Sequence, residues 1–270
     1  MQTIYAMSDI HGVLEPLRFR LSQLNMDEIR SGNTKLLFLG DYIDRGRNSF
    51  KVLETIRNLQ QDIGENVIAL MGNHERWFID FLYGKNPYWL GSFRNTSFLN
   101  EFLTTSELGN VNHLIARMKS HLAYGIVRKA MEERQQDLLS WLKALPLYYE
   151  TEHQIYVHAG VDEEAEDLWR VGTDDSYFTD KFPATKGYFY KDIIAGHVSA
   201  STASGRRDLH DIYYDGQSHF YIDGVDSYPL SVRDEDCVIP LLKYTEENGR
   251  GTYYSVQKDG ECRLICEKSW

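Results

Sequence analysis

An α/β fold with parallel strands is the fold class that the sequence predicts, because strand and helix patterns alternate through its first third. Short apolar runs at Thr3–Met7, Lys35–Leu39 and Asn66–Met71 are typical of strands. Helical patterns at Val13–Arg30 and Ser49–Ile63 separate them. A β-α-β-α-β order implies parallel pairing, because the connecting helices return the chain to the same sheet edge.

Helical patterns alone fill the stretch from about Arg76 to Pro146, at Arg76–Leu82, Val111–Tyr124 and Lys129–Leu145. This stretch is predicted to be a helical insertion or cap, at about residues 76–146, in a single domain that spans residues 1–270. At 270 residues the chain is long enough to bury one large core.

Strand patterns return in the last part of the chain. They lie at Gln154–Val157, Asp192–Ala195, His219–Ile222 and Val238–Tyr244. The chain then ends in a predicted hairpin, Thr252–Gln257 and Glu261–Cys266, with Lys258-Asp259-Gly260 as its turn.

Three cysteines lie in the C-terminal region. Cys262 and Cys266 are four residues apart in a predicted strand, which would place both on one face. A metal or redox pair is one interpretation of Cys262 and Cys266, and small buried hydrophobic side chains are the other. The first strand pattern starts at Thr3, which leaves no room for a signal peptide, and no apolar run approaches transmembrane length. A cytoplasmic location is therefore expected, and no membrane partner.

The chain is acidic, with a net charge of -11 and a pI near 5.3. An acidic chain gains little from counterion release on a nucleic-acid backbone, so we expect no nucleic-acid polymer as partner. Binding of a phosphate group would need positive charge concentrated locally, and metal ions are the obvious source.

Five short polar motifs lie at or just past the ends of predicted strands: Ser8-Asp9-Ile10-His11-Gly12, Gly40-Asp41-Tyr42-Ile43-Asp44-Arg45-Gly46, Gly72-Asn73-His74-Glu75, His158-Ala159-Gly160 and Gly196-His197. Ligands gather at the carboxyl ends of strands in such sheets, because the loops converge there. Chance recurrence of six ligand-type residues at five strand ends is very improbable.

The types of candidate ligand narrow the choice of metal ion. Oxygen ligands from Asp9, Asp41 and Asn73 would combine with imidazole from three histidines, His11, His158 and His197. A mixed nitrogen and oxygen set without thiolate suits manganese, iron or zinc in a catalytic centre. Six ligands exceed what one open ion takes, and they fit two divalent ions about 3.5–4 Å apart with a bridging carboxylate.

The motif series resembles the PPP family of metal-dependent Ser/Thr phosphatases, within the calcineurin-like metallophosphoesterases and nearest its bacterial and phage-type members. The resemblance covers about residues 3 to 200. It implies a four-layer αββα sandwich with the helical cap inserted. It also implies hydrolysis of phosphomonoesters by in-line attack of a hydroxide bound to two metals, with manganese the expected ion.

The resemblance also assigns roles. Asp9 and His11 would bind the first metal, Asp41 would bridge, and Asn73, His158 and His197 would complete the second site. His74 would be the general acid that protonates the leaving group, held by Asp44. Arg45 would grip phosphate oxygens. Arg170, in Leu168-Trp169-Arg170, resembles a second phosphate-binding arginine, and a surface arginine is its other interpretation.

Aromatic residues gather between Trp77 and Phe102, where bacterial relatives place a tryptophan beside the substrate entrance. Trp89 and Asn95 resemble part of that arrangement. Trp89 is therefore a candidate substrate-binding residue, and packing within the cap is the alternative.

Three functions compete. The first is a phosphatase acting on phosphoserine and phosphothreonine in proteins, which Asp44-Arg45-Gly46 favours. The second is a hydrolase of small phosphorylated metabolites such as dinucleoside polyphosphates. The third is a binding scaffold without activity, which predicts loss of a ligand or of His74, and all of these residues are present.

Overall fold

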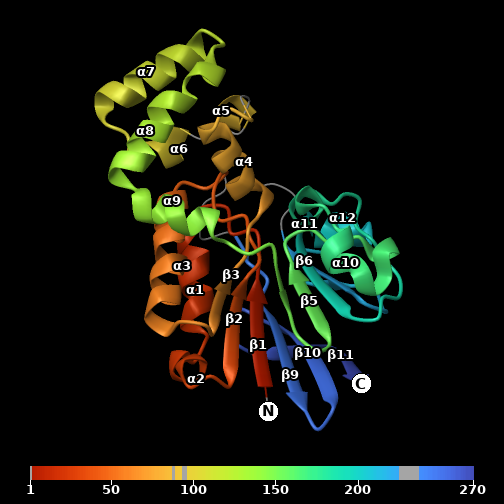
Figure 1. Cartoon of the computed structure of the whole chain (residues 1–270). Coiled ribbons are helices and arrows are strands. Elements are labelled where there is room, and N and C mark those ends of the chain that lie inside the picture. Colours follow the sequence, from red (N-terminus) through yellow and green to blue (C-terminus); the bar gives the residue numbers. More distant parts are fainter. Residues whose placement is uncertain (1, 87–88, 93–95, 225–236) are drawn as a thin grey trace.

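The structure is a computed structural model that describes residues 2–86, 89–92, 96–224 and 237–270. Two sheets lie face to face, with helices on their outer sides and a group of helices above their upper edges (Figure 1). No helix in these described ranges is long and apolar enough to cross a membrane.

The first sheet has six strands in the order β11-β10-β9-β1-β2-β3. Its parallel half comes from the N-terminal third, namely β1 (Gln2–Met7), β2 (Thr34–Phe38) and β3 (Val67–Ala69). β1 pairs in parallel with β2, and β2 with β3, as the alternating pattern predicts. β9 (Leu242–Glu247) pairs antiparallel with β1 and begins the other half. The predicted strand at Val238 starts four residues too early, because Pro240 has no amide hydrogen for a strand pairing.

The second sheet has five strands in the order β4-β5-β6-β8-β7. They are β4 (Tyr148–Glu150), β5 (Gln154–Val157), β6 (Asp192–Ser199), β7 (Tyr213–Tyr214) and β8 (His219–Asp223). β5, β6 and β8 run parallel, so their carboxyl ends point the same way.

Three apolar clusters define the layers. The middle cluster joins the facing sides of the sheets, with Ile4, Leu37, Ile194 and Phe220 among its buried members. A second cluster lies between the first sheet and its helices. A third lies between the second sheet and the segment around Trp169 and Phe178. Helix, sheet, sheet and helix therefore stack in four layers, which confirms the predicted αββα fold class.

The helices that cover the first sheet are α1 (Leu14–Ser22), α2 (Met26–Arg30) and α3 (Ser49–Ile63). The α3 bounds agree with the prediction. The single helix predicted for Val13–Arg30 is wrong: the chain breaks between α1 and α2, where the Asn25 side chain accepts hydrogen bonds from two amides of α2 as its N-cap.

Described residues between 76 and 146 contain helices and no strand. The helices are α4 (Asn73–Leu82), α5 (Trp89–Ser92), α6 (Thr96–Leu99), α7 (Thr105–Ala116), η1 (Ser120–Leu122), α8 (Tyr124–Arg134) and α9 (Gln136–Lys143). They project beyond the sheets while α9 lies against α3 (Figure 1). Their buried residues belong to the same cluster as the helical face of the first sheet. This shared core supports the proposal of one domain with a cap.

The second sheet carries shorter helices on its outer side: η2 (Glu163–Leu168), α10 (Trp169–Gly172), α11 (Asp175–Asp180) and α12 (Ala200–Ser204). α11 also lies against α4, so it links this layer to the first helix of the cap.

Two consecutive hairpins close the chain. β10 (Arg250–Val256) pairs with β9 through an Asn248-Gly249 turn that the sequence analysis overlooked, and with β11 (Cys262–Ser269) in the predicted hairpin. Both turn residues have positive φ, 51° at Asn248 and 73° at Gly249, as such a two-residue turn requires.

The predicted common face for Cys262 and Cys266 is wrong. The register of β10 and β11 shifts between Tyr253 and Tyr254, so Cys266 lies opposite Tyr253 while Cys262 lies opposite Val256. Tyr253 and Val256 are three residues apart and face opposite sides of the sheet. The bulge thus separates the two thiols, and a metal or redox pair does not form.

A polar bridge crosses the middle layer. The hydroxyl of Tyr253 on β10 donates to Asp192 of β6 at 2.7 Å and accepts from the Gln154 amide of β5 at 3.1 Å. Lys268 of β11 reaches the other oxygen of Asp192 at 2.6 Å. These contacts fix one sheet against the other, since a buried carboxylate is costly without its partners.

We expect Tyr253→Phe to lower the free energy of unfolding by about 1–2 kcal/mol, because Asp192 loses a donor that water cannot replace at this depth. Urea denaturation measures this change. Tyr254→Phe is the matched control, since its hydroxyl makes no hydrogen bond with the described residues. Equal stability of both variants would contradict the role of the bridge.

Candidate metal centre

Loops at the carboxyl ends of four parallel strands carry the site. Asp9 and His11 follow β1, Asp41 follows β2, Asn73 follows β3 and His158 directly follows β5. His197 differs, because it lies within β6 at an irregularity where the pairing with β8 shifts register. The predicted gathering of the six candidate ligands is what the topology produces, because parallel strands end at the same sheet edge.

Backbone conformation at these loops is strained. Six non-glycine residues of the site have φ between 46° and 71°, in the left-handed region: Asp9, His11, Asp41, Asp44, Arg45 and His197. Only three other described non-glycine residues share this region. Such strain persists where the surrounding structure over-determines it, and it is typical of functional sites.

Two glycines permit the loops to meet. A Cβ atom on Gly72 would lie 2.3 Å from both the amide nitrogen and Oδ1 of Asp41. A Cβ atom on Gly196 would lie 2.2 Å from Oδ2 of Asp9. Larger residues would therefore push the carboxylates of Asp9 and Asp41 out of place, which is why glycine precedes Asn73 and His197.

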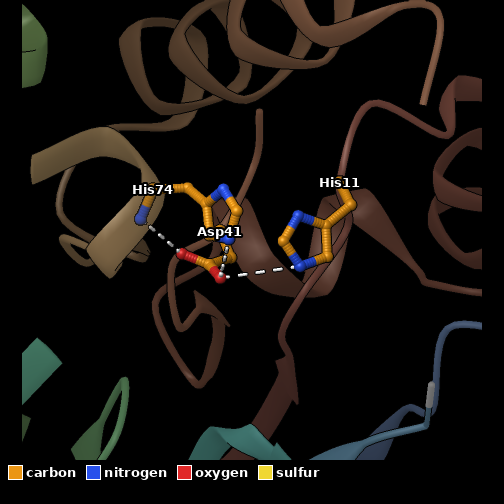
Figure 2. Close-up of side chains that lie close together, drawn as sticks. All are labelled: His11, Asp41 and His74. Carbon is orange, nitrogen blue, oxygen red and sulfur yellow. Dashed lines mark hydrogen bonds and ion pairs between the residues drawn. The ribbon is translucent and has the colours of Figure 1, made fainter. Parts of the chain in front are cut away.

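Asp41 lies at the centre. Its Oδ2 is 3.5 Å from Nε2 of His11 and 3.8 Å from Nε2 of His74, and its Oδ1 is 3.4 Å from Nε2 of His158. Figure 2 shows the rings of His11, from the loop after β1, and His74, from the first turn of α4, turned toward this carboxylate. The ligand atoms form two overlapping triads within 4.8 Å, His11–Asp41–His74 and Asp9–Asp41–His158. Asp41 belongs to both triads, a position that suits a bridging carboxylate.

Asn73 and His197 form a second cluster of candidate ligands together with His158. The amide oxygen of Asn73 lies 2.8 Å from Nε2 of His158 and 3.1 Å from Nδ1 of His197. Asp9 reaches this side through its Oδ2, which accepts from the backbone amide of His197 at 3.0 Å.

The histidine tautomers test whether these residues fit metal ions. Nδ1 of His11 lies 2.9 Å from the carbonyl oxygen of Ile43, and Nδ1 of His158 lies 2.8 Å from that of Leu39. Carbonyl oxygens only accept, so each Nδ1 donates and each Nε2 presents a lone pair to the site. Nε2 of His11 is buried and has no hydrogen-bond partner among the described residues.

The orientation of the Asn73 amide also indicates that lone pairs point into the site. Turned over, its nitrogen would donate to Asp41 at 3.2 Å and to His158 at 2.8 Å. With its oxygen toward these atoms, acceptors face acceptors, which is favourable when a cation lies among them. The donor set therefore fits divalent metal ions.

Electrostatics agree with this fit. Burial, together with the neighbouring Arg45, holds the pKa of His11 well below its usual value, and burial beside His158 lowers that of His197 to about 3. Neutral imidazole is the form that binds a metal. Burial, with Asp9 and Glu75 nearby, raises the pKa of Asp41 well above its usual value. The protein thus leaves negative charge at Asp41 under-compensated, and bound cations would neutralise it.

His74 belongs to the His11–Asp41–His74 triad and lies in the first turn of α4, where the cap begins. Its Nε2 faces Asp41, and its Nδ1 lies 2.5 Å from Oδ2 of Asp44. Burial lowers the pKa of His74, but Asp41 and Asp44 outweigh it, so this pKa lies above the usual value. The charged imidazolium is therefore favoured at this position.

Trp89 is 1% exposed and packs between Phe78 and Phe81. Its Nε1–H donates at 3.2 Å to the same oxygen of Asp44 that contacts His74. The structure therefore places Trp89 behind Asp44, with almost no surface for a substrate. Asn95, the other residue of that resemblance, lies outside the described residues.

Glu75 is a residue to which the sequence analysis gave no role. Its two oxygens accept from the amides of Asp41, Tyr42, Ile43 and Gly72, at 2.8–3.2 Å. It lies within the Gly72-Asn73-His74-Glu75 motif, and an acidic residue at the third position of a helix is a signal for capping that could have found it. Glu75 holds the loop that bears Asp41 against the start of α4.

Arg45 is half-buried at the edge of the centre. Its positive charge contributes to lowering the pKa of both His11 and His197. It lines a cavity of about 120 Å³ together with His197, Thr202, Phe182 and others.

Arg170 is placed differently. Its guanidinium makes a two-bond ion pair with Glu150 on β4, with Nε at 2.8 Å and Nη2 at 2.5 Å from the carboxylate. Glu150, on β4, lies opposite Ile155 of β5 in the sheet, and Ile155 is three residues before His158. No contact described for Arg170 reaches the ligand cluster, so its phosphate-binding role stays a prediction.

Comparison with protein families matches residues 2–219 to the family described as calcineurin-like phosphoesterase. The match covers most of the chain, and the chain belongs to this family. The class of protein that the fold and the site define is therefore a metal-binding phosphoesterase.

Among curated proteins, the chain is similar to a symmetrical bis(5'-nucleosyl)-tetraphosphatase of Marinomonas sp. (strain MWYL1), at 26% identity over 58% of this chain and 44% of that protein. A protein of the same name from Methylococcus capsulatus is 26% identical over 58% of this chain and 43% of its own length. The alignments thus span less than half of these relatives.

Among solved structures, the cold-active protein tyrosine phosphatase of a psychrophilic Shewanella species aligns with a TM-score of 0.54 at 18% identity. The alignment covers 98% of this chain and 81% of that one. At this identity the similarity supports the fold.

We expect Glu75→Gln to lower the free energy of unfolding by roughly 2–4 kcal/mol, because either amide orientation turns an NH₂ group against two backbone donors. Urea denaturation of metal-free protein measures the loss. Glu65→Gln, on an exposed side chain, serves as the control. Unchanged stability of Glu75→Gln would contradict the proposed clamp on the Asp41 loop.

Proposed function

We propose that this protein is a metal-dependent hydrolase of small phosphorylated nucleotides, with dinucleoside polyphosphates as its substrate class. The observation that carries the proposal is the convergence of five other candidate ligands on the surroundings of Asp41, with the lone pairs of His11 and His158 directed inward. The names of the curated relatives favour nucleotide substrates over phosphoproteins.

Two divalent ions would be held in this centre, one by Asp9 and His11, the other by Asn73, His158 and His197, with Asp41 between them. Such ions supply a hydroxide nucleophile near neutral pH and neutralise charge on the phosphoryl group. Manganese is the proposed ion, because a set rich in imidazole favours softer ions than magnesium.

The protein's own side chains would then orient the substrate and move a proton. Arg45 would bind phosphate oxygens through its planar guanidinium. His74 would protonate the leaving oxygen from Nε2, while Asp44 accepts from its Nδ1–H and keeps the ring charged and correctly turned. Trp89 would act as a positioning residue, since its indole donates to Asp44. Arg170 would have to leave Glu150 before it could reach a phosphate.

Dephosphorylation of Ser/Thr residues in proteins is the second candidate. The His74–Asp44 contact favours it, because an alkyl leaving group from serine or threonine needs a proton more than a phosphate leaving group does.

The proposed function predicts hydrolysis of dinucleoside tetraphosphate by manganese-loaded protein, with a higher kcat/KM than for a phosphoserine peptide. Chelation should abolish the activity, and manganese should restore it better than magnesium. A substrate panel monitored by phosphate and nucleotide release tests both points. Full activity in excess chelator, with metal analysis showing no bound ion, would overturn the two-metal centre. A preference for the peptide would favour the second candidate.

His74→Asn should leave metal content unchanged and reduce kcat by roughly 10²–10⁴-fold on an alkyl phosphate. The loss should be smaller on nitrophenyl phosphate, whose leaving group scarcely needs a proton. Trp89→Phe keeps the apolar ring without the donor, and should give a loss of the same kind but only about 3–10-fold, as for one hydrogen bond. Equal losses on both esters would argue against His74 as the acid.

A further inference from the structure

Phe182 is an exposed aromatic residue at the edge of the metal centre. Its side chain is 69% exposed, yet it lines the cavity that Arg45 and His197 also line. Single exposed apolar residues are common and need no explanation by themselves. Phe182 differs because its ring borders a charged cavity beside a metal-ligand residue.

The position of Phe182 is fixed by the residue before it. Lys181 is buried, and its Nζ donates to the carbonyl oxygen of Val161 at 2.8 Å and pairs with Glu163 at 2.6 Å. A Cβ atom on Gly160 would lie 2.4 Å from Cδ of Lys181, so the lysine stem packs directly across this glycine. Gly160 is two residues from His158, and Lys181 therefore ties Phe182 to the loop that carries a metal ligand.

A second contact holds the preceding helix. The carbonyl oxygen of Phe178, in α11, accepts from the amide of Ala159 at 2.8 Å. α11 also lies against α4, which begins at Asn73 and His74. The segment that precedes Phe182 is thus anchored to the loop after β5 and to α4, while the Phe182 side chain remains largely exposed.

The residues that line the cavity include both a cationic and an aromatic side chain. Arg45 provides the positive charge that suits phosphate oxygens, while the carboxyl group of Asp223 also lines the cavity. Phe182 provides a flat apolar surface, and aromatic side chains bind nucleobases by stacking irrespective of base identity.

We propose that Phe182 is the stacking platform for the nucleoside base of the substrate, in a subsite that holds the phosphate toward Arg45. This inference rests on the proposed function, because it requires a nucleotide phosphate at the metal centre. Phe182 lies between α11 and β6, so the proposed aromatic contact with substrate comes from the layer outside the second sheet and not from Trp89 of the cap.

Calorimetric binding of AMP and of ribose 5-phosphate to manganese-loaded protein tests the subsite, since the two ligands differ by the base alone. Wild type should bind AMP more tightly. Phe182→Ala should reduce this advantage by roughly 5- to 100-fold, the range for loss of one stacked base, and leave ribose 5-phosphate unchanged. Phe182→Tyr should restore it. Thermal melts should stay close to wild type, because the side chain is exposed.

Tyr188→Ala is the matched control, because Tyr188 is 81% exposed and does not line the cavity. The subsite would be overturned if Phe182→Ala kept the wild-type preference for AMP over ribose 5-phosphate, or if Tyr188→Ala lost that preference to the same extent. Either result would leave metal-dependent hydrolysis intact. The assignment to a nucleoside base would be overturned if Phe182→Ala weakened the binding of phosphotyrosine relative to phosphoserine but did not change the binding of AMP relative to ribose 5-phosphate. Absence of any metal-dependent hydrolysis in wild type would instead refute the proposed function.

Discussion

The buried carboxylate of Asp41 organises the arrangement around it. It follows β2, with its side chain facing His11 and His158 from two other loops and His74 from the first turn of α4, and burial raises its pKa well above the usual value. A carboxylate in this position is unfavourable unless compensated. Glu75 is a second buried carboxylate beside it. The backbone amides of Asp41, Tyr42 and Ile43 donate hydrogen bonds to Glu75, and these bonds hold the Asp41 loop in place. Divalent cations would complete the compensation.

Strain and close packing are consequences of this arrangement. The loops at Asp9, His11 and Asp41, and the irregularity of β6 at His197, adopt left-handed backbone conformations, which a free peptide would avoid. The four-layer core makes this possible, because the parallel strands on either side hold each loop end at a set position. Glycines at 72 and 196 then allow carboxylates and backbone to approach within contact distance. The stability of the fold thus maintains the site's unfavourable geometry.

The cap is coupled to this centre through side chains as well as through the backbone. α4 starts at Asn73, so its first turn carries a ligand, the proposed acid and the loop clamp. Trp89 returns from α5 to contact Asp44 through its indole while its ring packs among Phe78 and Phe81. Packing of the cap and orientation of His74 are therefore connected.

The sequence by itself determined the α/β class, the parallel pairing of the first three strands and which polar residues gather at the strand ends as candidate ligands. These features are local: alternating patterns specify elements, and strand ends carry their own polar motifs. Only the tertiary structure decided which partner each long side chain finds. Arg170 pairs with Glu150, Trp89 is buried behind Asp44, and Phe182 borders the cavity. These three residues lie 20 to 137 positions along the sequence from Glu150, Asp44 and Arg45, so no pattern within a short window specifies where they lie. The faces of Cys262 and Cys266 depend instead on a one-residue bulge, which such a pattern does not specify either.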